Sequence, residues 1–227
     1  MAEANPETKV QKYPRTPHFP FSPGVNADDI MLPSSTKHTF LSQEAILTEK
    51  LDGGNCSIFR GKVFARTVGE QATHPSFGAI KQLAAQISCL IPDNIQIFCE
   101  NLFAIHSIQY DGLDSYVYIF AVLENGKRWL SWDEVVEWSD TLGVPTVPMV
   151  QRGIFGTQTI VEEIINKKMK QQSAVSTTTP EGFVLRCTGG FNYNELDKYC
   201  AKYVRAGHIQ TDEKWKKTWK QAKLTAK

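Results

Sequence analysis

The sequence has little that would point to a membrane protein, a zinc site or a disulfide-rich scaffold. No stretch approaches the roughly 18 uninterrupted apolar residues of a membrane-spanning helix, and residues 1–12 lack the apolar segment of a secretion signal. The five cysteines are odd in number and include no Cys-x-x-Cys pair, which argues against a zinc site and a disulfide framework. We therefore expect an intracellular, cytoplasmic protein whose cysteines are reduced and mostly buried.

An excess of charge of one sign is also missing. The chain has 25 Lys and Arg against 24 Asp and Glu, so any affinity for nucleic acid depends on where these charges lie. The motifs GxxxxGK(S/T), GxGxxG, GxSxG and HExxH are absent, which leaves P-loop kinases, dinucleotide-dependent dehydrogenases and zinc proteases without support. With 227 residues, 41% of them hydrophobic, the chain can bury a sizeable core.

The hydrophobic pattern predicts a mixture of strands and helices. Strands are predicted over residues 45–51, 57–59, 63–65, 95–102, 116–123, 127–130 and 182–186. Helices are predicted over residues 79–90, 132–142, 157–172, 194–203 and 212–227, with Ile160, Val161, Ile164 and Ile165 of the third facing the core. Asn125-Gly126 favours a tight hairpin turn, and Ser131 with Glu134 has the form of a helix capping box.

The overall organisation favours one α+β domain. Residues 13–23 contain four prolines, which forbid a continuous helix and favour an extended segment. No internal repeat and no long linker divides the rest of the chain. We therefore expect antiparallel sheets flanked by helices.

The segment Glu49-Lys50-Leu51-Asp52-Gly53-Gly54-Asn55 lies at the end of a predicted strand. Glycines there let the backbone approach a ligand closely, so the lysine can lie in a pocket rather than on a solvated surface. Taken alone, so short a pattern is more often an ordinary strand end and turn than a functional site.

Other segments follow it in a specific order: Ala65-Arg66-Thr67, Phe98-Cys99-Glu100-Asn101-Leu102, Tyr118-Ile119-Phe120, Glu181-Gly182-Phe183-Val184-Leu185-Arg186 and Lys202-Tyr203-Val204-Arg205. In this order they resemble the successive motifs of the covalent nucleotidyltransferase superfamily, which contains ATP-dependent RNA ligases, DNA ligases and mRNA capping enzymes. The segments 13–18 and 202–212 are most similar to the RNA ligase branch. The resemblance covers residues 13–215.

This resemblance implies a single nucleotidyltransferase domain (an ATP-grasp-like adenylyltransferase) over residues 13–215, between a flexible N-terminus (1–12) and a basic C-terminal tail (216–227). It implies ATP and Mg²⁺ as cofactors, with Mn²⁺ as an alternative ion. The partner that it implies is RNA with 5′-phosphate and 3′-hydroxyl ends. Lys50 would be adenylylated by ATP, AMP would pass to the 5′-phosphate, and the 3′-hydroxyl would displace it.

Physical chemistry assigns roles to the cations. A lysine attacks phosphorus only as the neutral amine, and burial beside other cations makes that form of Lys50 accessible. Magnesium together with Lys202, Arg66 and Arg205 would neutralise the displaced phosphates. The last motif of the superfamily usually has two lysines one residue apart, but Val204 occupies the second position here. Arg205 and Lys198 are both candidates for the second cation.

The remaining site residues have roles that the resemblance implies. Glu100 would hold the ribose hydroxyls, Glu181 the metal, and Phe120 a face of the adenine. Glu49 and Asn55 would lie around the adenosine and the reacting phosphate, and Asp52 would assist the later steps.

Each residue also has an ordinary structural interpretation. Lys50 can be a solvated strand-end lysine, Arg66 the partner of a surface acid, and Phe120 a core residue. Glu100 and Glu181 can be edge-strand carboxylates. Three histidines are candidates either for phosphate contacts or for simple packing, namely His18, His74 and His208.

The C-terminal tail offers a candidate surface for RNA. Residues 214–227 contain six lysines and no acid, with Trp215 and Trp219 four residues apart. Lysines neutralise phosphates and tryptophan stacks on bases, although both tryptophans can equally pack the tail onto the core. The run 167–170 is a weaker candidate. The short remainder after residue 215 disfavours a DNA ligase or a GMP-transferring capping enzyme, and a degenerate nucleotide- or RNA-binding module is the other alternative.

Overall fold

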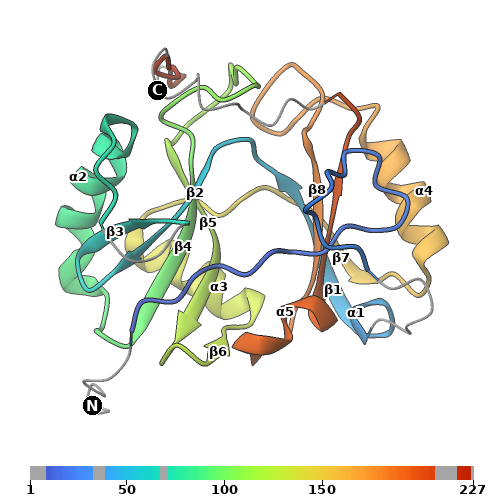
Figure 1. Ribbon diagram of the computed structural model, residues 1–227, viewed down its shortest axis with the longest axis horizontal. Helices are drawn as coiled ribbons and strands as arrows, with labels where there is room; N and C mark the ends of the chain where they lie inside the picture. The colour runs from blue at the N-terminus through green and yellow to red at the C-terminus, as the bar shows by residue number, and fades with distance from the viewer. Residues whose placement is uncertain (1–8, 33–38, 67–70, 208–218, 226–227) are drawn as a thin grey trace.

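Two antiparallel β-sheets form the framework of the protein (Figure 1). The computed structural model describes residues 9–32, 39–66, 71–207 and 219–225. The four-stranded sheet has the order β10 (Cys200–Val204), β8 (Gly182–Cys187), β1 (Glu44–Lys50), β7 (Met149–Ile154). The six-stranded sheet has the order β3 (Lys62–Ala65), β2 (Gly54–Phe59), β4 (Ile95–Asn101), β5 (Val117–Glu124), β6 (Arg128–Trp129), β9 (Phe191–Asn192). The predicted fold class is confirmed.

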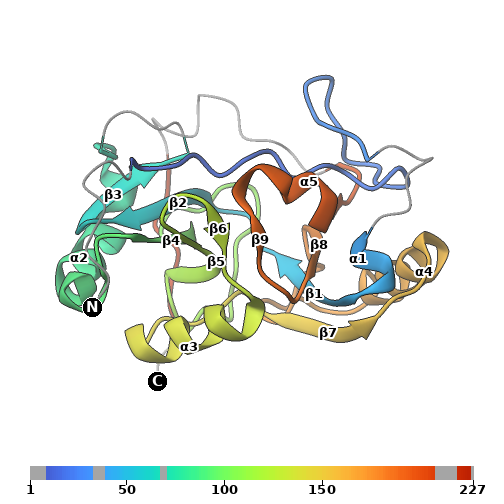
Figure 2. The same ribbon diagram turned by 90° about the horizontal axis from the view of Figure 1, so that it is seen from below.

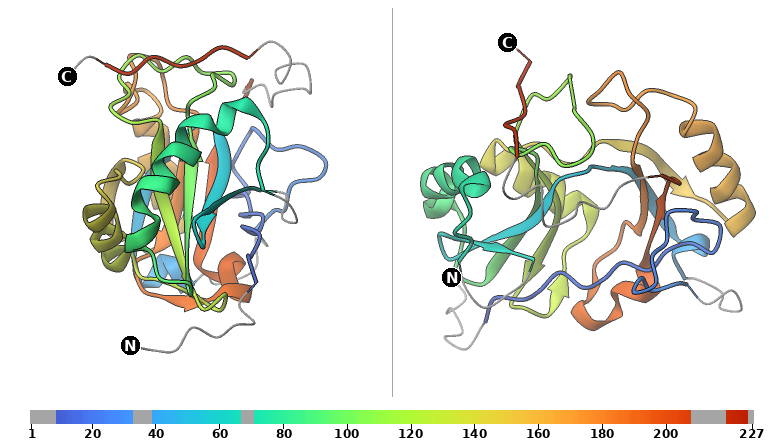
Figure 3. Two further views of the ribbon diagram at one scale, coloured as in Figure 1. Left: turned by 90° about the vertical axis from the view of Figure 1, so that its left-hand side faces the viewer. Right: turned by 45° about the horizontal axis from the view of Figure 1, so that its top comes forward.

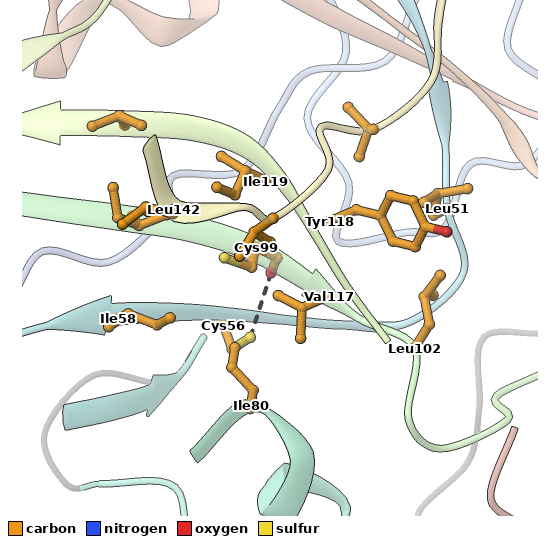
Figure 4. Close-up of a cluster of buried hydrophobic side chains, with 14 of the residues drawn as sticks. Leu51, Cys56, Ile58, Ile80, Cys99, Leu102, Val117, Tyr118, Ile119 and Leu142 are labelled. Atoms are coloured by element: carbon orange, nitrogen blue, oxygen red, sulfur yellow. Dashed lines mark hydrogen bonds between the residues drawn. The ribbon is translucent and has the colours of Figure 1, made fainter. Parts of the chain in front are cut away.

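Helices cover the outer faces of the two sheets (Figures 1 and 3). The helices α2 (Gly78–Ile87) and α3 (Trp132–Leu142) bury apolar residues against the six-stranded sheet. Figure 4 shows Ile80 of α2 and Leu142 of α3 in the resulting core. The helix α4 (Gln158–Lys168) packs Val161 and Ile165 on the four-stranded sheet. The helices α1 (Thr39–Ser42) and α5 (Leu196–Tyr199) are single turns.

A third cluster of buried side chains fills the space between the two sheets. It includes Phe98 and Trp129 from the six-stranded sheet and Cys200 from the four-stranded one. The buried Arg186 of β8 bridges the sheets, because its guanidinium donates to the carbonyl oxygens of Leu130 at 2.6 Å and Phe120 at 3.3 Å. These contacts fix the two sheets relative to each other.

Residues 9–19 run as an extended segment across both sheets, and residues 20–32 turn back so that Ile30 and Leu32 hydrogen-bond with the backbone of His18 (Figure 2). At one end, the backbone of Gln11 exchanges two hydrogen bonds with the side chain of Gln96. Further along, Phe19 N donates to Lys202 O and Lys202 N donates to Pro17 O, both at 2.8 Å. The segment therefore covers the free edge of β10, and the extended path of residues 13–19 agrees with the prediction from the prolines.

Local turn and capping signals are confirmed. Asn125 and Gly126 have φ angles of 54° and 66°, which suit the tight turn between β5 and β6. The capping box of Ser131 and Glu134 is formed, and Gly143 ends α3 with a φ of 62°.

Several predicted helices are wrong. Within 194–203 only α5 is an α-helix, and residues 200–204 form β10, since pairing with β8 overrides the local pattern. The helix α4 ends at Lys168, and Ile160 is exposed rather than facing the core. Of the helix predicted over 212–227, the described residues 219–225 are extended along the 103–113 loop, where Ala222 N donates to Phe103 O at 2.9 Å. The strand β7 was not predicted.

Candidate active site

The side chain of Lys50 meets that of Glu181 at the junction of the two sheets. Lys50 ends β1 and pairs with Gly182, the first residue of β8, so Glu181 lies directly beside it. Lys50 Nζ is 2.6 Å from Glu181 Oε1 and 2.7 Å from Oε2. The Glu181 side chain is 3% exposed and that of Lys50 29%. Glu181 is therefore a buried carboxylate that forms an ion pair with Lys50, rather than a solvated residue at a strand edge.

Carboxylates dominate the electrostatics of Lys50. Burial lowers the pKa of its ammonium, but Glu181, Glu100 and Asp52 together outweigh burial and raise the pKa above its usual value of 10.5. In this arrangement Lys50 is protonated at neutral pH. The neutral amine that the sequence analysis expects can therefore form only if the electrostatic effect of Glu181 on Lys50 is reduced.

Glu100 reaches the same region from β4. Its Oε1 accepts a hydrogen bond from Gly53 N at 3.1 Å. Burial raises the pKa of Glu100 to about 8, against the opposing effect of Lys50 and with the help of the Glu181 and Asp52 carboxylates. A Cβ at Gly53 would lie 2.6 Å from Asn101 O, so only glycine allows this loop to approach the end of β4.

Asp52 and Glu49 anchor the loops around the site. Asp52 Oδ2 accepts hydrogen bonds from Ser107 N at 2.8 Å, Ser107 Oγ at 2.7 Å and Ile108 N at 2.8 Å. Glu49 accepts from Ala174 N at 2.8 Å and from the hydroxyl of Ser173. Sequence reasoning missed both serines; the Ser- and Thr-rich stretch after residue 172 was the available signal for the second.

The Glu49 side chain lies on the opposite face of β1 from Lys50, because successive side chains of a strand alternate. Burial raises the pKa of its carboxyl. The Glu49 side chain is therefore turned away from Lys50 and holds the 173–174 loop.

Lys202 approaches Lys50 from β10. Its side chain is 17% exposed, and its Nζ lies 3.4 Å from Asp29 Oδ1. Burial lowers the pKa of Lys202; Asp29 opposes this effect, whereas Lys50 and Arg66 add to it. Arg66 is exposed directly after β3. Lys50 and Arg66 therefore both act electrostatically on Lys202.

The two candidates for a further cation differ. Lys198 is 61% exposed and pairs with Glu195 at 2.9 Å on the surface. The predicted helix over residues 194–203 would have placed it one turn before Lys202, but that helix is wrong, since residues 200–204 form a strand. Arg205 follows β10, and its backbone N donates to Glu181 O at 3.0 Å. Its buried Nε has no hydrogen-bond partner among the residues that the structure describes.

A protein-family model described as RNA ligase matches residues 43–204, the span from β1 to the end of β10. The chain belongs to the RNA ligase family. Solved structures of the Naegleria gruberi RNA ligase have the same fold. A mutant with ATP and Mn is 17% identical at a TM-score of 0.57, covering 74% of this chain and 52% of its own. The structure with PPi is 18% identical at 0.56, covering 76% and 52%.

Another mutant, with AMP and Mn, is 19% identical at a TM-score of 0.53, covering 73% of this chain and 51% of its own. The chain thus spans about half the length of these solved RNA ligases. A search of curated proteins finds no match. Among the described residues, no helix is long and apolar enough to cross a membrane.

The structure describes both residues that the resemblance places near the adenine and the reacting phosphate, Asn55 and Phe120. Asn55 is half-buried on β2 and pairs with Glu100. Phe120 is half-buried and is skipped in the β4–β5 pairing, with its ring centroid 5.0 Å from that of Tyr13. It packs between the sheets, whereas the buried Tyr118 ring lies beside Leu51 in the core under the outer helices (Figure 4).

The two candidate histidines that the structure describes, His18 and His74, both contact other residues of the protein. His18 is buried, with Nδ1 2.9 Å from Ser22 Oγ. His74 caps a 3₁₀ turn by accepting from Ser76 N, and its ring lies 6.1 Å from that of Trp219. His208 and Trp215 lie outside the described residues.

The carboxylate of Glu181 fits a divalent ion that takes one ligand from the protein and its other ligands from nucleotide phosphates and water. Among the described residues, no group of three or more His, Cys, Asp or Glu side chains could hold a metal ion. Mg²⁺ commonly takes one or two carboxylates and completes its shell with phosphate oxygens and water. Elsewhere, a groove of about 570 Å³ lies between α2 and the rings of Phe103 and Tyr116, and it is lined by none of the site residues above.

Proposed function

We propose that this protein is an ATP-dependent RNA ligase that joins 5′-phosphate and 3′-hydroxyl RNA ends through an AMP adduct on Lys50. The observation that carries the proposal is the contact of Lys50 with the buried Glu181, inside the segment that matches the RNA ligase family. The similar Naegleria gruberi structures contain ATP or AMP with Mn, which supports ATP and a divalent ion as cofactors.

The chemistry of the first step follows from the residues of the site. The Lys50 amine attacks the α-phosphorus of ATP, so that a phosphorus–nitrogen bond forms, a phosphorus–oxygen bond breaks and pyrophosphate leaves. Lys202 and Arg66 lower the barrier by stabilising the charge on the leaving phosphates. A divalent ion at Glu181 would supply further neutralisation of that charge.

Loss of the Lys50 proton is the electrostatic requirement of this step. Glu181 is the carboxylate that raises the pKa of Lys50 most, against burial, which lowers it. Whatever draws the charge of Glu181 away from Lys50 therefore leaves burial to favour the neutral, nucleophilic amine. Glu181 thus has two effects: through the divalent ion it helps to neutralise the phosphates, and through its own charge it sets the protonation of Lys50.

Intact mass and peptide mapping after incubation with ATP and Mg²⁺ test the proposal. We expect one AMP on Lys50, no label in Lys50→Ala, and full label in Lys81→Ala, a control on an exposed position of α2. Glu181→Gln would relieve the charge on Lys50 but would also remove the carboxylate that holds the divalent ion, so we expect labelling to slow, with a barrier higher by about 2.7 to 4 kcal/mol if the loss matches that of one oxyanion-hole donor. An adduct on another lysine would show that the nucleophile is misassigned.

The choice of nucleotide and polynucleotide separates the neighbouring functions. GTP should label poorly, and efficient GMP transfer would instead indicate a capping enzyme. A 5′-phosphorylated RNA should be sealed in preference to a DNA nick. Labelling without any sealing of RNA ends would support the alternative of a binding module.

A further inference from the structure

The N-terminal segment, residues 9–32, places the carboxylate of Asp29 beside Lys202, one of the cations proposed to bind the phosphates. Asp29 Oδ1 lies 3.4 Å from Lys202 Nζ, and Asp29 Oδ2 lies 3.3 Å from Nε2 of the buried His18. The Asp29 side chain is only 13% exposed. A carboxylate that is largely buried between a lysine and a histidine is not an ordinary surface acid.

Backbone hydrogen bonds hold this acid in place. The segment pairs with the backbone of Lys202 on both sides of His18, because Phe19 N donates to Lys202 O and Lys202 N donates to Pro17 O. His18 N also donates to Ile30 O at 2.7 Å, which ties the turn carrying Asp29 to the same strand edge. Asn26 N donates to Asp29 Oδ2 at 3.0 Å and orients the carboxylate. Asp29 is therefore a fixed part of the site wall.

The charges around Lys202 explain why an acid is needed there. From the N-terminal segment, Asp29 and His18 face it; Lys50 acts on it from β1, and Arg66 from the end of β3. Burial lowers the pKa of His18 to about 4, so this imidazole adds no charge at neutral pH. Without Asp29, the Lys202 ammonium would be left partly buried among two other cations, and repulsion would favour its displacement or deprotonation.

We propose that Asp29 is a positioning residue of the adenylylation site, which holds the charged Lys202 side chain beside Lys50 so that it can stabilise the departing phosphates. The proposal rests on the proposed function and adds to it a residue from outside the segment that matches the RNA ligase family. Asp29 acts through Lys202 and makes no contact with the nucleotide itself.

The test is the rate of Lys50 adenylylation at saturating ATP. Asp29→Asn keeps the shape of the side chain and removes its charge, and it should slow labelling about 10- to 100-fold, the scale of loss for a misplaced catalytic group. Asp28→Asn is the matched control: this neighbouring acid has a 72% exposed side chain and pairs with Arg15 on the surface, so labelling should be unchanged. Asp29→Glu keeps the charge and should retain most of the rate.

A double-mutant cycle separates positioning from a structural role. If Asp29 acts through Lys202, adding Asp29→Asn to Lys202→Met should cost no further rate. The same loss in both backgrounds, an undiminished rate in Asp29→Asn, or an equal loss in Asp29→Glu would overturn the proposal.

The Lys202 contact can also be measured without ligase activity. Titration of the lysine ammonium groups by NMR should show a lower pKa for Lys202 in Asp29→Asn than in the wild type, and no change in Asp28→Asn. If the wild type takes no AMP, the proposed function fails, while this titration still decides whether Asp29 controls Lys202. An unchanged Lys202 pKa in Asp29→Asn would refute the contact itself.

Discussion

Glu100 should make the protein less stable as the pH rises, and replacing it with glutamine should remove that penalty. Burial raises the pKa of Glu100 from 4.5 to about 8 in the folded protein. The folded state therefore holds a proton that the unfolded chain releases between these two pH values. The stability linked to Glu100 is complete below pH 4.5 and is lost as the pH rises through 8.

The magnitude follows from the size of the pKa change. One pKa unit is worth about 1.4 kcal/mol, so ionising Glu100 in its folded surroundings costs on the order of 5 kcal/mol. Glutamine keeps an oxygen that can accept the hydrogen bond from Gly53 N and carries no charge. We expect Glu100→Gln to have the same free energy of unfolding as the wild type near pH 4.5, and to exceed it by about 2 to 5 kcal/mol at pH 9.

Urea denaturation at a series of pH values measures this difference. Glu163→Gln, at an exposed position of α4, is the control for the same substitution on the surface. A difference between Glu100→Gln and wild type that stays constant from pH 4.5 to 9 would refute the reasoning. The stabilised variant should nevertheless take AMP poorly, because a group kept at a cost in stability is typical of a functional site.

Two further predictions concern the tail and the contact between the sheets. Lys220→Glu with Lys223→Glu, both exposed, should weaken RNA sealing more than Lys50 adenylylation, and most strongly at low salt; sealing at the wild-type rate across a salt series would remove the tail from the RNA-binding surface. Arg186→Met should lower the free energy of unfolding by about 2 to 4 kcal/mol, because two charged hydrogen bonds between the sheets are lost. Arg152→Met, which breaks only surface ion pairs, should cost less than about 1 kcal/mol in the same urea titration.

The elements that the sequence predicts well are those with a local cause. The Asn125-Gly126 turn and the cap at Ser131 depend on neighbouring residues, and both are confirmed. The strands β7 and β10 depend on partners far along the chain, and their residues carry no clear alternation of apolar and polar side chains. Backbone pairing across the sheet decided these two segments, which local propensity cannot detect.

The site divides in the same way. The resemblance to known motifs drew attention to Lys50 and Glu181, which lie 131 residues apart and are in contact in the structure. No pattern around Asp29 or Ser107 marked either residue, because each acts on a side chain from a different part of the chain. Contacts of that kind become visible only when the fold has brought the segments together.

The pairing of the N-terminal segment with β10 ties the completion of the site to the completion of the chain. Asp29 and Lys202 are 173 residues apart, so a ribosome releases the first long before it makes the second. Closing so long a loop costs entropy that only late contacts repay, and such contacts form slowly. We therefore expect the charged side chains of the site to come together only after the N-terminal segment has paired with β10. Uptake of AMP by the new protein would then report on the folding of the whole domain.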